Sequence, residues 1–206
     1  MHQTRSNVTK RLPIKRKGTK YVAVASSHVN NSVPVVIAIR DMLNLAKTAK
    51  EVNEMIKAKV LKLNGKIVKD YHESIKLFNV LDAEKTYKLT ILPTGRFALE
   101  ETKEKNDRLC KVVNRRLLGK GEIQLNLHDG TNLVSKDKIN VGDSLYLDFS
   151  GKVKKHLKLE KGADAFIISG RYVGTIGKIE GINGKNVKIK FKEGFADLNE
   201  SQAVVI

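Results

Sequence analysis

Few residues of this sequence have the types and the spacing that catalysis needs. His128 and Asp129 are adjacent, and such a pair can transfer protons as an acid and a base. Asp129 precedes Gly130, however, and an Asp side chain in an Asp-Gly turn hydrogen-bonds its own backbone, so a turn is the favoured interpretation. Cys110 is the one cysteine, which excludes an internal disulfide and a paired-cysteine metal site. We therefore predict no catalytic residue and no metal site.

Glycines near the end of the chain, at Gly170, Gly174 and Gly177, flank an apolar run that is typical of β-strands. Their spacing differs from the G-x-G-x-x-G of dinucleotide-binding proteins. The segment Gly119-Lys120-Gly121 likewise lacks the spacing of a P-loop and the Ser or Thr that follows its lysine. We therefore expect no nucleotide cofactor and no small-molecule substrate. Glycines in strands allow sharp bends and close backbone approach, as small barrels require.

The charge of the chain is strongly positive and unevenly distributed. The net charge is +17, and residues 1–40 carry eight basic side chains and no acidic one. A concentrated positive field attracts a polyanion. Because Pro13 and Gly18 interrupt this region and no helical apolar stripe is present, nucleic acid is favoured over a membrane or over a run that only aids solubility. The candidates for contacting phosphate here are Arg5, Lys10, Arg11, Lys15, Arg16, Lys17 and Lys20.

The first elements that must position these charges are an arm and two helices. Residues 1–33 are polar and basic, and we expect an extended arm that becomes ordered on its partner. Two short helices are predicted within residues 34–58. Pro34 can begin the first helix, where its missing N–H costs nothing. Thr48 and Glu51 have the spacing of a capping box, which predicts the start of the second helix.

A short hairpin is predicted next, within residues 60–69. Asn64 and Gly65 both accept positive φ, so this pair favours a two-residue turn between strands. Basic and hydroxyl side chains around the two helices and the hairpin could bind phosphates, although a generic α+β fragment is an equal alternative on physical grounds. The candidates are Arg40, Lys47, Thr48, Lys50, Lys59, Lys62, Asn64 and Lys66.

From Tyr87 onward, short apolar runs alternate with glycine-containing turns, which predicts an almost wholly β structure. Many short strands of this kind are typical of small barrels, and the last barrel is expected to begin near Lys161. The predicted strands cover residues 87–92, 97–99, 122–127, 132–134, 144–149, 165–168, 174–182 and 187–191.

Two segments of the chain resemble known RNA-associated modules. The run from Leu45 to Glu51, followed by Lys59-Val60 and Asn64-Gly65-Lys66, resembles the S4-type RNA-binding domain, also called the alpha-L domain. This resemblance implies that the second helix and the loop after it contact RNA. The segment from Ser169 to Ile179 resembles a KOW motif, found in SH3-like barrels of ribosomal proteins and transcription factors. It adds Arg171 and Lys178 to the candidate RNA-binding residues.

The order of these modules is similar, over nearly the whole chain, to that of the ribosomal protein S4e family of archaea and eukaryotes. The segments 33–41, Lys69-Asp70-Tyr71, 109–112 and 162–177 also resemble that family. The implied fold class is α+β, with a basic N-terminal arm at residues 1–33, a small S4-type α/β domain at 34–86, a central β-rich domain at 87–160 and a C-terminal SH3-like KOW β-barrel at 161–206. The implied role is structural and non-enzymatic, in the small ribosomal subunit, with its rRNA and neighbouring ribosomal proteins as partners.

The resemblance implies a cytoplasmic setting on the ribosome, and the Lys-, Asn- and Ile-rich usage favours an archaeal source. No membrane association is expected. Two alternatives stay open: an RNA-modifying enzyme with an S4-type targeting domain, and a KOW-type transcription factor. Aromatic residues are scarce, at 5%, so base stacking is expected to be minor. Tyr21 and Tyr172 are the candidates for stacking, with core or barrel packing as the alternative.

Overall fold

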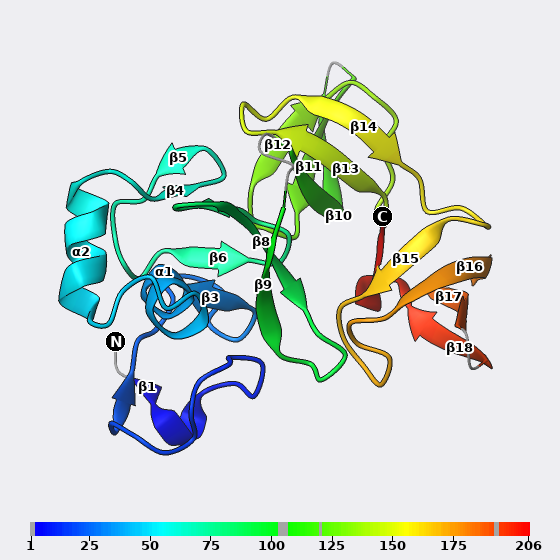
Figure 1. The fold of residues 1–206 in the computed structure, drawn as a ribbon. Coiled ribbons are helices and arrows are strands. Elements are labelled where there is room, and N and C mark those ends of the chain that lie inside the picture. The colour runs from blue at the N-terminus through cyan, green and yellow to red at the C-terminus, as the bar shows by residue number, and fades with distance from the viewer. Residues whose placement is uncertain (1–2, 103–106, 120, 192–193) are drawn as a thin grey trace. The chain divides into compact units, whose positions relative to one another are not determined.

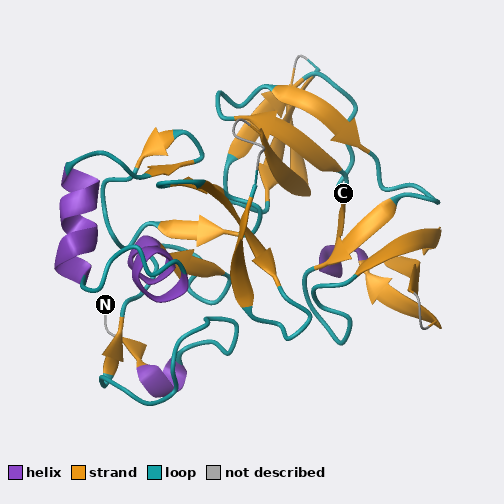
Figure 2. Ribbon diagram, viewed as in Figure 1, coloured by secondary structure: helices purple, strands orange, loops and turns teal. Residues whose placement is uncertain are grey.

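The structure is a computed structural model that describes residues 3–102, 107–119, 121–191 and 194–206. The chain is mostly β-strand with few helices (Figures 1 and 2). The sequence predicted an α+β fold, and the structure contains more strand and less helix than that class implies. The chain divides into two compact units, residues 1–106 and residues 107–206. None of the helices in the described part of the chain has the length and apolar character needed to cross a membrane.

The first unit contains a five-stranded antiparallel sheet in the order β5-β4-β7-β8-β9. Asn64 and Gly65 have φ of 49° and 76°, which confirms the predicted hairpin turn. Because β8 pairs with both β7 and β9, the predicted domain boundary between residues 86 and 87 falls inside this sheet. The strands are β4 Lys62–Leu63, β5 Lys66–Ile67, β7 Val80–Asp82, β8 Thr86–Ile91 and β9 Phe97–Glu101.

The two predicted helices are present in the first unit. Pro34 is the extended residue that caps the first helix, which continues from α-helical into π-helical geometry. Thr48 Oγ1 accepts from the Glu51 amide at 3.2 Å, as the capping box predicts. The Glu51 carboxylate reaches back one residue further than predicted, to the Lys47 amide at 2.8 Å. The elements are α1 Val35–Ile37, η2 Ala38–Met42 and α2 Ala49–Lys57, with β3 Ser32–Pro34 paired to β6 Ser74–Lys76.

The N-terminal segment is folded onto this unit, whereas the sequence predicted an extended arm. It contains β1 Gln3–Thr4, η1 Arg5–Asn7 and β2 Tyr21–Val22, and β1 pairs with β2. Leu12 is buried, and the Phe97 amide donates to the Arg11 carbonyl oxygen at 2.8 Å. A buried apolar side chain and a backbone bond to β9 hold the segment in place, and neither is visible as a pattern in the sequence.

The second unit begins with a five-stranded antiparallel sheet in the order β12-β11-β10-β13-β14. The predicted hairpin β11–β12 and strand β13 are confirmed. The longest strand, β10, was not predicted, because Lys111 interrupts its buried stretch from Leu109 to Val112 and the basic residues Arg115 and Arg116 follow in its exposed part. The strands are β10 Asp107–Gly119, β11 Glu122–Leu127, β12 Asn132–Ser135, β13 Ser144–Asp148 and β14 Val153–Leu157.

A second five-stranded antiparallel sheet completes this unit, in the order β18-β17-β16-β15-β19. The predicted close approach occurs at Gly177, where a Cβ would lie 2.5 Å from Ile189 Cγ2 and 2.8 Å from the Lys190 carbonyl oxygen. Strand β16 can therefore pass β17 only with glycine at that position. The elements are β15 Asp164–Ile167, β16 Ile176–Asn183, β17 Asn186–Phe191, β18 Gly194–Asn199, η3 Glu200–Gln202 and β19 Ala203–Val205.

Candidate RNA-binding surface

The guanidinium group of Arg5 shapes the N-terminal segment. Its Nε donates to the Thr19 carbonyl oxygen at 2.8 Å, its Nη2 donates to Thr19 Oγ1 at 3.1 Å, and its Nη1 donates to the Lys15 carbonyl oxygen. Gly18, with φ of +146°, packs against this group, and a Cβ there would lie 2.9 Å from Arg5 Nη2. Arg5 therefore holds the loop of residues 15–19 closed, a structural role that the sequence did not indicate.

A cavity of about 530 Å³ lies beside this loop and gathers predicted residues that are apart in sequence. Its basic lining residues are Arg5, Lys10, Lys15, Arg16 and Arg96. The sequence analysis missed Arg96, which lies in the turn between β8 and β9. The turn was predicted, but its place beside the N-terminal segment depends on a long-range contact, the backbone bond between Arg11 and Phe97. A basic residue in a hairpin turn was the one signal available for Arg96.

Three other predicted residues of this segment, Arg11, Lys17 and Lys20, do not line the cavity. Arg11 Nη1 donates to Asn31 Oδ1 at 3.0 Å. The Lys20 ammonium lies 5.5 Å from the ring centroid of Tyr21, a side chain that is 54% exposed. Lys17 is exposed. These groups extend the positive surface around the cavity without being part of it.

A second group of predicted residues surrounds α2 and the β4–β5 hairpin. Lys59, with φ of 58°, turns the chain from the end of the helix into the hairpin, and its amide donates to the Ile56 carbonyl oxygen at 2.9 Å. Within the described ranges, no carboxylate forms an ion pair with the lysine side chains of this group. The exposed lysines are Lys47, Lys50, Lys59, Lys62 and Lys66.

One acidic side chain of α2, that of Glu51, is engaged in the helix cap. The Glu51 carboxylate accepts from the Lys47 amide at 2.8 Å and from the Thr48 hydroxyl at 2.9 Å. The bond from the Lys47 amide, followed by that from Thr48, lowers the pKa of Glu51 below its usual value. Glu51 thus stays ionised and fixes the helix start, where Thr48 acts as the cap.

Two predicted residues of this group are engaged within the chain. Asn64 Oδ1 accepts from the Val80 amide at 2.9 Å, which holds the hairpin turn against β7. Arg40 Nη2 donates to Asp41 Oδ2 at 2.7 Å, so a neighbouring carboxylate offsets its charge. Both residues have structural partners that the spacing of the sequence did not reveal.

In the second unit, the predicted Arg171 and Lys178 are exposed. Tyr172 stacks on Phe191, with ring centroids 4.6 Å apart and an interplanar angle of 9°, and it packs against the core of the last sheet. This arrangement supports the packing interpretation of Tyr172. The Arg171 guanidinium lies 5.9 Å from the centroid of the same ring.

The sequence analysis missed one exposed aromatic residue in this sheet, Phe195, which is 53% exposed. The Nζ atoms of Lys188 and Lys190 lie 5.3 Å and 5.6 Å from its ring centroid. Lys190 also pairs across the strands with Lys178. The sequence did not distinguish Phe195 from a core residue, because an isolated phenylalanine is more often part of a core.

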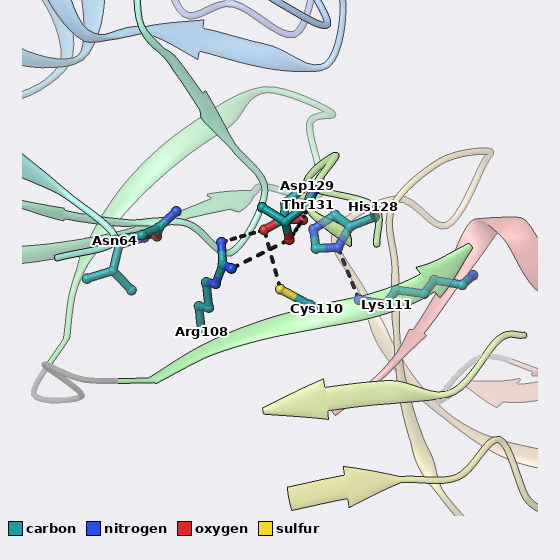
Figure 3. Close-up of polar contacts among 8 residues, drawn as sticks. Asn64, Arg108, Cys110, Lys111, His128, Asp129 and Thr131 are labelled. Carbon is teal, nitrogen blue, oxygen red and sulfur yellow. Dashed lines mark hydrogen bonds and ion pairs between the residues drawn. The ribbon is translucent and has the colours of Figure 1, made fainter. Parts of the chain in front are cut away.

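The residues that first invited a catalytic interpretation form a turn in the second unit (Figure 3). Asp129 Oδ1 accepts from the Thr131 amide at 2.9 Å, and Asp129 Oδ2 accepts from Arg108 Nη1 at 2.6 Å. His128 Nδ1 accepts from the Lys111 amide at 3.0 Å. Burial raises the pKa of the neighbouring Cys110 thiol far above its usual value. These contacts confirm the turn and give both side chains a structural role.

Comparison with known proteins agrees with this architecture. A model of the ribosomal family S4e matches residues 83–153. Small ribosomal subunit protein eS4 of Archaeoglobus fulgidus is 34% identical over 186 residues, which cover 87% of this chain and 79% of that relative. The corresponding protein of Desulfurococcus amylolyticus is 31% identical over 201 residues, 88% of this chain and 79% of its own.

A solved structure has the same fold. The crystal structure of the 30S ribosomal protein S4e from Thermoplasma acidophilum has a TM-score of 0.75 and 26% identity, and the match covers 85% of this chain and 95% of that one. The similarity in sequence and in fold extends through both compact units, because each match spans most of the chain. This chain belongs to the ribosomal protein S4e family.

Proposed function

We propose that this protein is a structural constituent of the small ribosomal subunit, where it binds rRNA and takes part in translation without catalysing a reaction. The similarity to small-subunit proteins over most of the chain is the observation that carries this proposal. An archaeal source and a cytoplasmic location on the ribosome follow from it. Its partners are the small-subunit rRNA and neighbouring ribosomal proteins.

We further propose that α1, α2 and the β4–β5 hairpin form an S4-type RNA-binding module. A capped helix followed by a tight hairpin, with exposed lysines on both, supports this assignment. Such a surface contacts phosphates and recognises the shape of an A-form helix, whose deep groove side chains cannot enter. The proposed RNA contacts of this module are Lys47, Lys50, Lys59, Lys62 and Lys66.

The last sheet, with β15 to β19, is proposed to be the KOW-type SH3-like module. Its support is the close passage of β16 over β17 at Gly177 and the exposed basic residues Arg171 and Lys178. The central sheet, with β10 to β14, is then the β-rich module between the two. No specific observation favours the RNA-modifying enzyme or the transcription factor, since His128 and Asp129 are engaged in a turn.

Sedimentation tests the proposed function directly. In a lysate of the source cells at moderate salt, the protein is expected to sediment with small ribosomal subunits in a sucrose gradient. High salt should release it, because phosphate contacts weaken as salt rises. Protein that stayed at the top of the gradient even in dilute buffer would contradict the proposal. Co-sedimentation with RNA polymerase would instead favour the transcription-factor interpretation.

A further inference from the structure

The cavity beside the N-terminal segment has a one-sided lining. Four of its basic residues, Lys10, Lys15, Arg16 and Arg96, are exposed, and none of the described residues that line it carries a carboxylate. Within the described ranges, none of these four side chains has an ion-pair partner. Cations that face one concave space repel one another, and low-dielectric walls concentrate their field. These like charges therefore disfavour one another, and an anion bound in the cavity would offset their repulsion.

The cavity is preformed rather than assembled from loose chain. Arg5 closes the 15–19 loop with bonds to two backbone carbonyl oxygens, at Lys15 and Thr19. Leu12 is buried beneath the segment, and the Arg11 carbonyl oxygen accepts from the Phe97 amide at 2.8 Å, next to Arg96. Two walls of different sequence origin are thus fixed to one another, so little ordering of the backbone remains for a ligand to impose.

The size and lining of the cavity define the class of ligand. A volume of about 530 Å³ lies within the range of about 300–1,000 Å³ of small-ligand sites, and exceeds what one phosphate group would fill. Hydroxyl groups of Ser6, Thr9 and Thr94 add neutral hydrogen-bonding groups, and Val8 and Ile14 supply an apolar wall. This mixture suits a phosphodiester together with its ribose, and arginine in particular binds phosphate oxygens in a bidentate manner.

We propose that this cavity is a preformed site for a bend in the RNA backbone, with one nucleotide and its flanking phosphodiester inserted between Arg16 and Arg96. The inference rests on the proposed function, because the RNA is the ligand that the ribosome would supply. It goes further by assigning a site to the turn between β8 and β9. It also replaces the extended arm expected from the sequence with a shaped pocket.

The test compares Arg96→Gln with Lys69→Gln, a matched loss of one exposed charge in the same unit but outside the cavity. Binding of each full-length variant to transcribed small-subunit rRNA is measured by filter binding over a range of KCl concentrations. Arg96→Gln should weaken binding about tenfold, as expected for one charge-assisted contact, and lower the salt slope by about 1. Lys69→Gln should change affinity far less, and Arg96→Lys should recover part of the loss.

Two further measurements separate a site from general attraction and from a free anion. In a double-mutant cycle, Arg16→Gln and Arg96→Gln should together cost less than the sum of the single losses, because both contact one bend. If the losses of affinity of the two single variants were additive and neither exceeded that of Lys69→Gln, the proposed site would be wrong. The alternative ligand is free inorganic phosphate. It is tested by measuring thermal unfolding with phosphate replacing chloride at constant ionic strength. If Arg96→Gln abolished a phosphate-dependent stabilisation but left rRNA affinity unchanged, the cavity would bind free phosphate and the RNA assignment would be wrong.

The result that would contradict this inference differs from the result that would contradict the proposed function. Wild-type protein that binds rRNA tightly while Arg96→Gln binds equally well would overturn the cavity alone. Wild-type protein that neither binds the rRNA nor sediments with small subunits would overturn the proposed function. Circular dichroism and the thermal midpoint of each variant show whether it is folded, and Arg5 and Gly18 are left unchanged because they shape the loop.

Discussion

Lys111 donates a hydrogen bond of 2.6 Å from Nζ to the carbonyl oxygen of Ala203, a residue 92 positions further along the chain. The same buried ammonium group also donates to the Glu200 carbonyl oxygen. Lys111 belongs to β10, and its two acceptors are the first residue of the short helix η3 and the first residue of β19. One side chain therefore ties the central sheet of the second unit to its last strand.

Replacing Lys111 with Met should destabilise the protein at neutral pH by about 1–3 kcal/mol. The aliphatic volume is retained, but two carbonyl oxygens lose a charged donor, and hydrogen bonds to charged groups contribute about this much. Urea unfolding followed by circular dichroism measures the change. Lys155→Met, which changes an exposed lysine of β14, is the control.

The free energy of unfolding of the wild-type protein should also depend on pH through Lys111. The Lys111→Met variant should lack this dependence. Burial lowers the pKa of Lys111 from 10.5 to about 8, so between these values the unfolded chain binds more protons than the folded one. The contribution of Lys111 to stability therefore rises with pH across that window. Subtracting the unfolding free energies of Lys111→Met from those of wild type isolates this rise. A flat difference between pH 8 and pH 10.5 would contradict the assignment.

Asp129→Ala should be among the more damaging single changes in the second unit, at about 3–5 kcal/mol. The Asp129 side chain is 1% exposed and that of its partner Arg108 is 12% exposed, so the substitution leaves a buried guanidinium without its carboxylate. The exposed Asp137→Ala is the control for losing an acidic side chain in this unit, and should change stability little. Chemical denaturation of both variants gives the comparison.

Acid should remove the same contribution from the wild-type protein. Burial opposes ionisation of Asp129 most strongly, but the bonds from Thr131 and the charge of Arg108 prevail, so its folded pKa lies below its usual value. Its contribution is thus complete at neutral pH and is lost as the pH falls through the folded pKa. The unfolding free energy of Asp129→Ala should accordingly fall less on acidification than that of wild type.

Gly177 and Gly181 provide a matched pair within β16. A Cβ on Gly177 would lie 2.5 Å from Ile189 Cγ2, whereas one on Gly181 would have nothing within 4 Å, and neither residue has a positive φ. Gly177→Ala should cost about 2 kcal/mol or more through overpacking, and Gly181→Ala should stay within about 0.5 kcal/mol of wild type. Thermal melts of both variants test this, and equal melting temperatures would mean that the strands do not approach closely.

Changing Lys15, Arg16 and Lys17 together to Ala should weaken binding to small-subunit rRNA and flatten its salt dependence. If each makes one phosphate contact, the slope of log affinity against log salt should fall by about 2 to 3. Since Arg16 and Lys15 line the cavity and Lys17 does not, the single Lys17→Ala should have the smallest effect of the three. An unchanged slope for the triple variant would show that this segment does not bind phosphates.

The sequence was sufficient for those parts of the fold that depend on local chemistry. Asn64-Gly65 predicts a turn because of its backbone preferences, and Thr48 predicts a helix start through a bond three residues away. Strand β10 could not be predicted in the same way, because it is half buried and half exposed along its length. Its side chains therefore follow no single alternation.

The candidate site was predictable in its charge but not in its geometry. Basic residues near the N-terminus were identified from composition alone, yet the sequence does not show that Arg5 is used to close a loop. Arg96 lies beside these residues through long-range contacts, among them a backbone hydrogen bond from the Phe97 amide to the Arg11 carbonyl oxygen. Long-range contacts of this kind leave no periodic pattern, which is why Arg96, and likewise Phe195, could not be anticipated.

The closed loop around Arg5 also affects how the protein would meet its RNA. A segment that folds only on binding buries new apolar surface, and its association shows a large negative heat-capacity change. Here the protein's own contacts bury Leu12 and hold residues 15–19 closed. The entropy cost of ordering this segment is therefore met when the chain folds. RNA binding is expected to show a small heat-capacity change, and the segment is expected to resist proteases in the free protein.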